Sequence, residues 1–149
     1  MSNDLLDKLN RENLQIASFK NRALAYIVDN IVLCFIVFII FYDQFSNAKT
    51  QVEVVNILTN FSFGFILLQI SYHTIFTYLY GASLGKMLFK ILIVDDEFLD
   101  KPNFTKSLLR STIRQVSDMA FMLGFAWALS NVYCKTWEDY VSGTIVIDA

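Results

Sequence analysis

The sequence predicts an all-α integral membrane protein with about three membrane-embedded helices, an N-terminal interfacial helix and a small cytoplasmic β element. Hydrophobic residues make up 55% of the 149 residues and aromatic residues 15%, more than in an ordinary soluble domain. The apolar residues also gather into three long runs, as membrane helices require. The net charge is −2, and the basic residues are spread among acidic ones. No nucleic-acid partner is therefore expected.

The first two runs have the length of membrane-spanning helices. Residues 23–42 form a largely apolar run of about 20 residues, or about 30 Å of helix, which matches the hydrocarbon core of a bilayer. Residues 57–80 form the second run. Three tyrosines lie toward its end like an interfacial aromatic belt (Tyr72, Tyr78, Tyr80). We therefore expect both runs to span the lipid bilayer.

The third run, residues 116–133, is shorter and carries Asp118 near its start. It is only just long enough to cross. The alternative is a segment that enters and leaves on the same side and bends near Gly124, which requires protein to bury the broken backbone. Both interpretations stay open.

Lysines and arginines around these runs indicate the orientation. The leader, residues 1–22, carries four of them and the loop 81–115 carries six, whereas the loop between the first two runs has only Lys49. By the positive-inside rule, the N-terminus and the second loop are cytoplasmic in a multi-pass protein of the cell membrane. We expect the membrane domain to comprise residues 23–149.

The leader itself has a helical pattern. Five apolar residues fall within one arc at 100° per residue (Leu5, Leu9, Ile16, Phe19, Ala23). Such a pattern favours a helix lying in the membrane interface. A frayed polar leader is the alternative.

Two short runs have strand character. Residues 88–94 (LFKILIV) are followed by the acidic turn DDEFLDKPN, and residues 143–147 (GTIVI) lie in the tail, residues 134–149. Paired with each other, they place the tail on the side of the loop 81–115. Three full crossings place it on the other side, so the side of the tail stays open.

Charged residues inside apolar runs are costly and need a reason. Arg22 and Asp29 are seven residues apart and so share one helix face. Asp29 needs a cationic partner, a proton or an ion. It either pairs with an arginine and fixes helix packing, or it forms a proton or cation site.

Further polar groups lie on the second run and before the third. Gln69 and the single histidine, His73, belong to a polar stripe that faces other helices. His73 either relays protons or forms a hydrogen bond across a helix interface. Arg110, Arg114 and Asp118 lie at the expected membrane boundary, where the arginines snorkel, pair with Asp29 or Asp139, or bind lipid headgroups.

Sequence motifs for catalysis are missing. The chain has one histidine, no cysteine pair at metal-ligand spacing, no nucleophile elbow and no phosphate-binding glycine pattern. We therefore expect neither an enzyme nor a metal site, and no cofactor.

Four motifs resemble those of the RDD family of small membrane proteins, which is named for one arginine and two aspartates. They are RALAYIVD (22–29), GASLGKMLFKILIV (81–94), LLRSTIR (108–114) and KTWEDYVSGTIVI (135–147). Two positions depart from the family pattern: Glu138 stands where histidine is common, and Ser83 where threonine is frequent. This puts in doubt any proton chemistry of that histidine.

The resemblance implies candidate residues and two functions. Arg22, Asp29 and Asp139 are the family's three charged residues, and Gly81, Gly85 and Lys86 belong to its loop motif. Some members are described as cation/proton antiporters, which implies transport of monovalent cations or protons by a homo-oligomer. The alternative is a non-catalytic membrane scaffold or assembly factor, in which the three charges form a buried network and a membrane protein partner docks.

Overall fold

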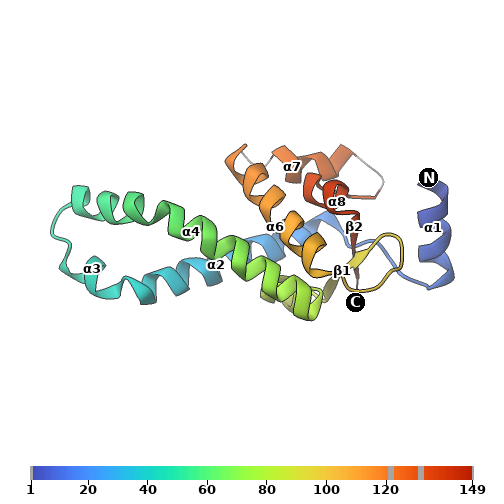
Figure 1. The fold of residues 1–149 in the computed structure, drawn as a ribbon, viewed down its shortest axis with the longest axis horizontal. Helices are drawn as coiled ribbons and strands as arrows, with labels where there is room; N and C mark the ends of the chain where they lie inside the picture. The colour runs from blue at the N-terminus through green and yellow to red at the C-terminus, as the bar shows by residue number, and fades with distance from the viewer. Residues whose placement is uncertain (1, 121–122, 131–132, 149) are drawn as a thin grey trace.

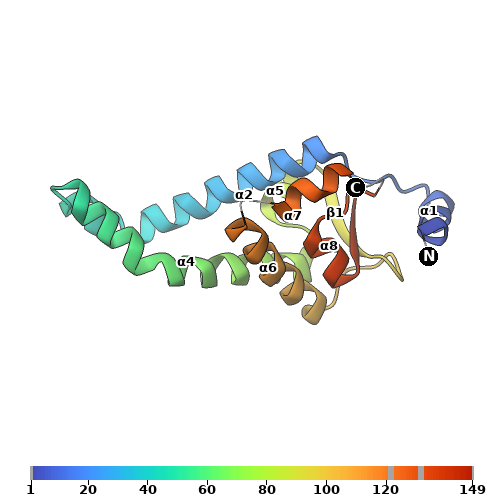
Figure 2. The same ribbon diagram turned by 90° about the horizontal axis from the view of Figure 1, so that it is seen from above.

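The computed structural model describes residues 2–120, 123–130 and 133–148. Two long helices, α2 (Phe19–Ile40) and α4 (Gln51–Tyr80), extend from a compact head and are joined at their far ends by α3 (Tyr42–Asn47) (Figure 1). The elements of the head are α5 (Leu84–Leu88), β1 (Ile91–Asp95), α6 (Phe104–Met119), α7 (Leu123–Ala126), the 3-10 helix η1 (Trp127–Ser130), α8 (Trp137–Ser142) and β2 (Thr144–Asp148). Both chain termini lie at the head end, beside α1 (Ser2–Arg11) (Figures 1 and 2).

Among the described residues, α2 and α4 are the two helices long and apolar enough to cross a membrane, with mean hydropathies of 2.6 and 1.6. Each begins at a side-chain cap: Ser18 Oγ accepts from the Asn21 amide, and Thr50 Oγ1 accepts from the Glu53 amide. α4 ends at Gly81, whose φ of +71° suits glycine. Both helices begin earlier than the predicted runs 23–42 and 57–80, and α2 ends two residues earlier.

The predicted third membrane helix over residues 116–133 is not formed as one helix. α6 ends at Met119, and the next described helices, α7 and η1, have four residues each; residues 121, 122, 131 and 132 lie outside the described part. The physical reason is the polarity of α6, which buries a face of serines and arginines (Ser107, Arg110, Ser111, Arg114, Ser117). A helix with that face packs against protein. The chain leaves the α6 axis at Ala120, before the bend proposed near Gly124.

The two predicted strands do pair. β1 and β2 are antiparallel, with Ile93 opposite Val146 and Ile91 opposite Asp148. The inward residues Ile91, Ile93 and Val146 are at most 1% exposed and form a core with Ala17 and Ala25. The sheet therefore joins the tail to the loop 81–115, at the end of the molecule where the N-terminus also lies (Figure 1).

The helical pattern of the leader is interrupted: α1 ends at Arg11, and the next helix, α2, begins at Phe19. Ile16, predicted to continue the helix, instead forms a β-bridge with Ile147. Leu9 is 2% exposed and packs with Leu5 against the sheet residues Val94, Ile145 and Ile147. The expectation of one continuous helix is therefore wrong, because the chain between α1 and α2 pairs with β2. Leu9 of α1 is covered by the sheet inside the protein.

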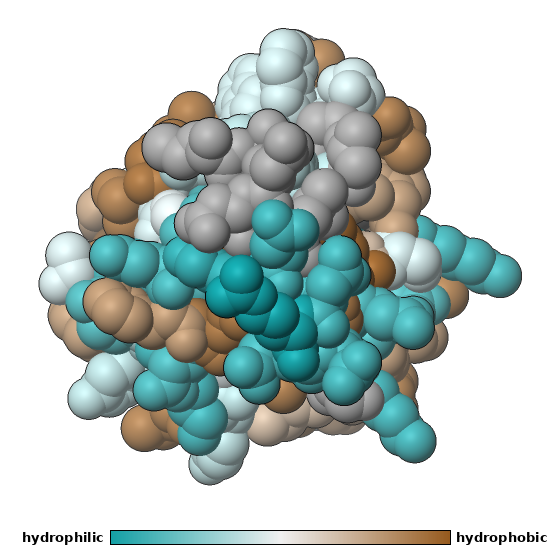
Figure 3. Space-filling model, turned by 90° about the vertical axis from the view of Figure 1, so that its right-hand side faces the viewer, coloured by the Kyte–Doolittle hydropathy of each residue, from teal (hydrophilic) through white to brown (hydrophobic). Residues whose placement is uncertain are grey.

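Around the apolar core of the sheet, three helices of the head, α5, α6 and α8, bury polar residues and expose apolar ones. α6 exposes its apolar residues (Phe104 53%, Leu108 41%, Val116 51%, Met119 67%) and buries its arginines. α5 exposes Leu88 and buries Lys86, and α8 exposes Val141 and buries Asp139. Hydrophilic side chains instead gather at the end that carries the termini, with apolar residues around its flanks (Figure 3). The head thus presents exposed apolar residues on these helices, as the two long helices do.

Candidate functional site

Asp139 is the centre of an ion-pair network that joins three helices. It lies at the third position of α8, is 0% exposed, and accepts the Thr136 amide at 2.9 Å in a capping box. Arg22 of α2 donates to Oδ2 of Asp139, and Arg110 of α6 donates to Oδ1. One carboxylate therefore holds two helices and the first turn of its own helix.

The two arginines have further acceptors. Arg22 also donates to the carbonyl oxygen of Cys134. Arg110 also donates to Thr144 Oγ1 on β2, and it lies 3.5 Å from Oε1 of Glu138. Burial alone would raise the pKa of Asp139, but Arg110 and Arg22 hold that pKa well below its usual range. Asp139 is therefore a permanent anion at neutral pH.

Asp29 forms a second, separate site. It is 0% exposed and accepts three hydrogen bonds, from the Tyr72 hydroxyl at 2.9 Å, the Gly85 amide at 2.8 Å and the Ser83 hydroxyl at 2.5 Å. The Tyr72 oxygen in turn accepts from the Leu84 amide at 3.1 Å. No described residue forms an ion pair with Asp29, so the pairing with an arginine, one of the two interpretations of this residue, is not made. Neutral donors from α4 and from the loop motif bind the carboxylate instead.

The loop motif approaches α2 unusually closely. A Cβ atom on Gly85 would lie 2.2 Å from the carbonyl oxygen of Ala25 and 3.0 Å from Cγ of Asp29. Gly85 is thus required by contact, and Gly81 by its backbone conformation. The seven-residue spacing of Arg22 and Asp29 therefore lets one face of α2 hold α8 at one point and α5 at the other.

The third group of charges surrounds Lys86. Lys86 is 6% and Arg114 9% exposed. The Arg114 guanidinium lies 4.7 Å from the centre of the Tyr26 ring, and the Tyr26 hydroxyl donates to Asp118 at 2.9 Å. Burial raises the pKa of Asp118, and it lowers that of Lys86 well below its usual value, with Arg110 adding to the effect. Neither Arg110 nor Arg114 is exposed in a way that suits headgroup binding.

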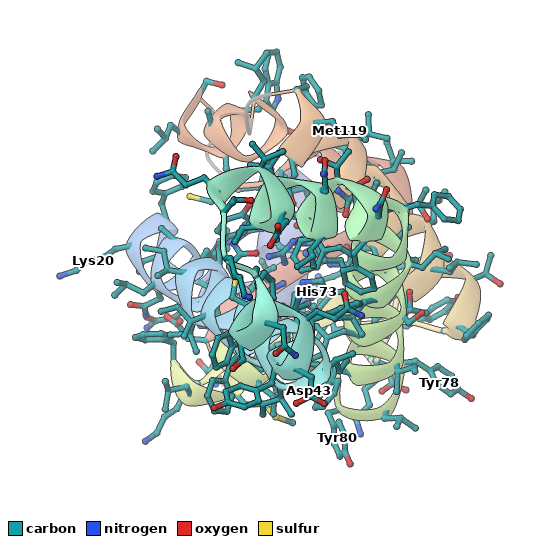
Figure 4. The ribbon with its side chains drawn as sticks, turned by 90° about the vertical axis from the view of Figure 1, so that its left-hand side faces the viewer. Lys20, Asp43, His73, Tyr78, Tyr80 and Met119 are labelled. Atoms are coloured by element: carbon teal, nitrogen blue, oxygen red, sulfur yellow. The ribbon has the colours of Figure 1, made fainter. Side chains whose placement is uncertain are left out.

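The polar stripe of α4 is divided between different surroundings. His73 and Thr77 are buried toward α6 and line one cavity with Arg110 and Arg114. His73 lies at the centre of the body, whereas Tyr78 and Tyr80 point outward (Figure 4). Gln69 is half-buried and forms no hydrogen bond or ion pair with described residues.

Several residues of these sites were missed by sequence reasoning. Tyr72, assigned to an aromatic belt, is buried and binds Asp29. The pattern of Thr136 followed three residues later by Asp139 is itself a capping-box signal. The roles of Thr144 and the Cys134 carbonyl had no signal in the sequence, because they depend on the meeting of distant elements.

Among described residues, no group of three or more histidine, cysteine, aspartate or glutamate side chains is arranged to hold a metal ion. The model of the RDD family matches residues 16–143. Neither the comparison with curated proteins nor the comparison with solved structures gave a match. The matched range includes all three groups of charges described above.

Proposed function

The chain belongs to the RDD family, and from this premise we propose that it is a non-catalytic membrane assembly module, whose buried charges hold a rigid head on two membrane anchors. The observation that carries this proposal is that the family's three charged residues, Arg22, Asp29 and Asp139, are hydrogen-bonded within the fold. Asp139 accepts three donors and Asp29 accepts three donors. Both oxygens of each carboxylate therefore already accept protein donors, which compete with a transported cation.

The surface of the head supports a location at the membrane boundary. A helix that buries arginines and exposes leucine, valine and methionine, as α6 does, is suited to lipid or to an apolar partner. The basic residues around the head favour a cytoplasmic position for it, with the N-terminus, in the cell membrane.

The two proposed membrane anchors, α2 and α4, form a groove that suits a partner. Between α2, α3 and α4 lies an apolar groove of about 510 Å³. Four phenylalanines line it together with two small residues (Phe38, Phe45, Phe61, Phe65, Cys34, Ser62). Small residues in a membrane groove allow close approach of another helix. We propose that this groove receives a transmembrane helix of the assembled partner.

Transport by an oligomer is the second candidate, and one observation favours it. Two cavities of water-molecule size lie among the buried charges, on either side of Lys86 and Arg114. Each cavity, however, is lined by three cationic side chains and fewer carboxylates. That lining repels sodium or potassium, so the geometry favours the assembly module over a cation path.

The substitution Asp29→Asn separates the two functions. The amide keeps one acceptor but disturbs the bonds from Ser83, Tyr72 and Gly85, so we expect a loss of about 1–3 kcal/mol in stability and lower abundance in the membrane. The measurements are abundance, the Tm of the purified protein, and proton-coupled sodium, potassium and lithium flux in liposomes. Flux in the wild type that Asp29→Asn abolishes, at unchanged abundance, would establish transport instead.

A crosslinking experiment tests the groove. A photo-reactive side chain at position 62 faces the groove, whereas one at position 63 replaces Phe63, which is 70% exposed on the same helix. We expect position 62 to crosslink to one defined membrane protein or to a second copy, and position 63 to lipid. Equal protein crosslinking from both positions contradicts a specific role of the groove.

A further inference from the structure

Two small cavities flank Lys86 and Arg114 inside the head. One lies between α2, α5, α6 and α8 and includes Tyr26 and Asp118 in its lining; the other lies between α4, α5, α6 and α8 and includes His73 and Ser111. Each has a volume of about 10 Å³. That space holds one water molecule or one monatomic ion and nothing larger.

The cavity beside His73 has an excess of positive charge. Lys86, Arg110 and Arg114 line it, against the single carboxylate of Glu138. Arg110 is already engaged with Asp139 and lies 3.5 Å from Glu138. Glu138, the one carboxylate in this lining, is therefore shared with Arg110, which already pairs with Asp139.

Two of the cations have no hydrogen-bonded anion in the described part of the chain, although the Arg114 guanidinium lies over the Tyr26 ring. Nη2 of Arg114 is buried and forms no hydrogen bond in the described part of the chain. Lys86 is also buried, with an exposed fraction of 6%. Its Nζ makes no ion pair or hydrogen bond with a described residue. A buried donor without an acceptor is costly, and a buried unpaired charge more so.

We propose that the cavity between α4, α5, α6 and α8 binds a monatomic anion, chloride, against Lys86 and Arg114. A cation is repelled by the lining, and phosphate or a lipid headgroup exceeds the volume. The hydroxyl groups of Thr77 and Ser111, which also line the cavity, are further donors for an anion. The site goes beyond the assembly function, which does not require it.

Loss of the Lys86 proton is the competing way to relieve the same excess of charge. Burial, followed by Arg110, lowers the pKa of Lys86. The titratable groups that line the two cavities with Lys86 are Arg22 and Tyr26 from α2, His73 from α4, Arg110, Arg114 and Asp118 from α6, and Glu138 from α8. A neutral Lys86 still leaves the Arg114 donor unsatisfied, which an anion satisfies.

The test is the Tm of the purified full-length protein in sodium chloride and in sodium gluconate at equal ionic strength and pH, since gluconate is too large for the cavity. We expect chloride to raise the Tm saturably by about 3–6 °C. Lys86→Met and Arg114→Gln remove this dependence. In gluconate, Lys86→Met is at least as stable as the wild type, because an unpaired buried cation has been removed.

The matched control is Lys20→Gln, which removes one positive charge from an exposed side chain that points away from the body (Figure 4). It keeps the full chloride dependence. Bromide in crystals of the wild type should give an anomalous peak between Lys86 and Arg114, a result that does not depend on any variant folding. A wild type with no halide dependence and no bromide peak overturns the proposal, as does a chloride effect that survives in both cavity variants. Stability that rises with pH through the range of Lys86, without a halide effect, assigns the charge relief to proton loss instead.

Discussion

Replacing Asp139 by asparagine is expected to lower the free energy of unfolding by about 3–5 kcal/mol, because it removes the one anion shared by two buried arginines. Arg22 is 3% and Arg110 4% exposed, so water cannot replace the lost carboxylate. The amide also weakens the cap of α8, since Thr136 donates to the same side chain. A loss of this size is a large part of the stability of a small domain, so the variant should accumulate poorly in membranes.

The measurement is the Tm and the membrane abundance of Asp139→Asn beside the double variant Asp139→Asn/Arg22→Met. Removing Arg22 as well leaves Arg110 with Glu138 as its remaining acid, so part of the lost stability should return. Arg22→Met alone should cost more than it does in the background of Asp139→Asn. Additive effects of the two substitutions would show that Arg22 and Asp139 do not stabilise the fold through each other.

The pH dependence of stability follows from the same contacts. The folded pKa of Asp139 lies below its unfolded value, so its contribution is present above about pH 4, the usual aspartate pKa. It is lost as the pH falls from that value through the folded pKa. Asp139→Asn should therefore differ most from the wild type at neutral pH, and the difference should shrink in acid.

The sequence predicted correctly those features of the fold that depend on a single segment of the chain. The length and hydropathy of the first two apolar runs predicted α2 and α4, and β-branched runs predicted both strands and their pairing. The spacing of Arg22 and Asp29 correctly placed both on one buried face of α2. These features depend on local periodicity, which a single chain displays directly.

The predictions from sequence were wrong where contacts between distant segments determine the local structure. Hydropathy over residues 116–133 favoured a membrane helix, but the buried polar face of α6 begins before that window, at Ser107. The leader pattern continued past Arg11, yet Ile16 pairs with β2. Asp29 was expected to need a cationic partner, a proton or an ion, whereas a hydroxyl from α4 and donors from the loop motif meet beside it. Such partners become visible only when distant segments are brought together.

Gly85→Ala is the second substitution for which we expect a large effect. Its Cβ would lie 2.2 Å from the Ala25 carbonyl oxygen, a backbone atom of α2 that cannot turn aside. The loop motif must then move away from α2, and the bonds from Gly85 and Ser83 to Asp29 lengthen or break. Overpacking typically costs about 1–3 kcal/mol, and an unsatisfied buried carboxylate adds to this.

Gly64→Ala is the matched control, because it makes the same change within α4. There the added Cβ would meet the Phe61 ring, at 2.6 Å, which is a side chain able to rotate, and alanine favours a helix over glycine. We expect Gly64→Ala to leave the Tm nearly unchanged and Gly85→Ala to lower it strongly. Ala25→Gly should not rescue Gly85→Ala, since the clash is with the carbonyl oxygen and not with the alanine methyl group. Rescue by Ala25→Gly, or equal effects of the two alanine substitutions, would mean that the loop motif does not approach α2 by its backbone, and the docking of α5 on Asp29 would then need another explanation.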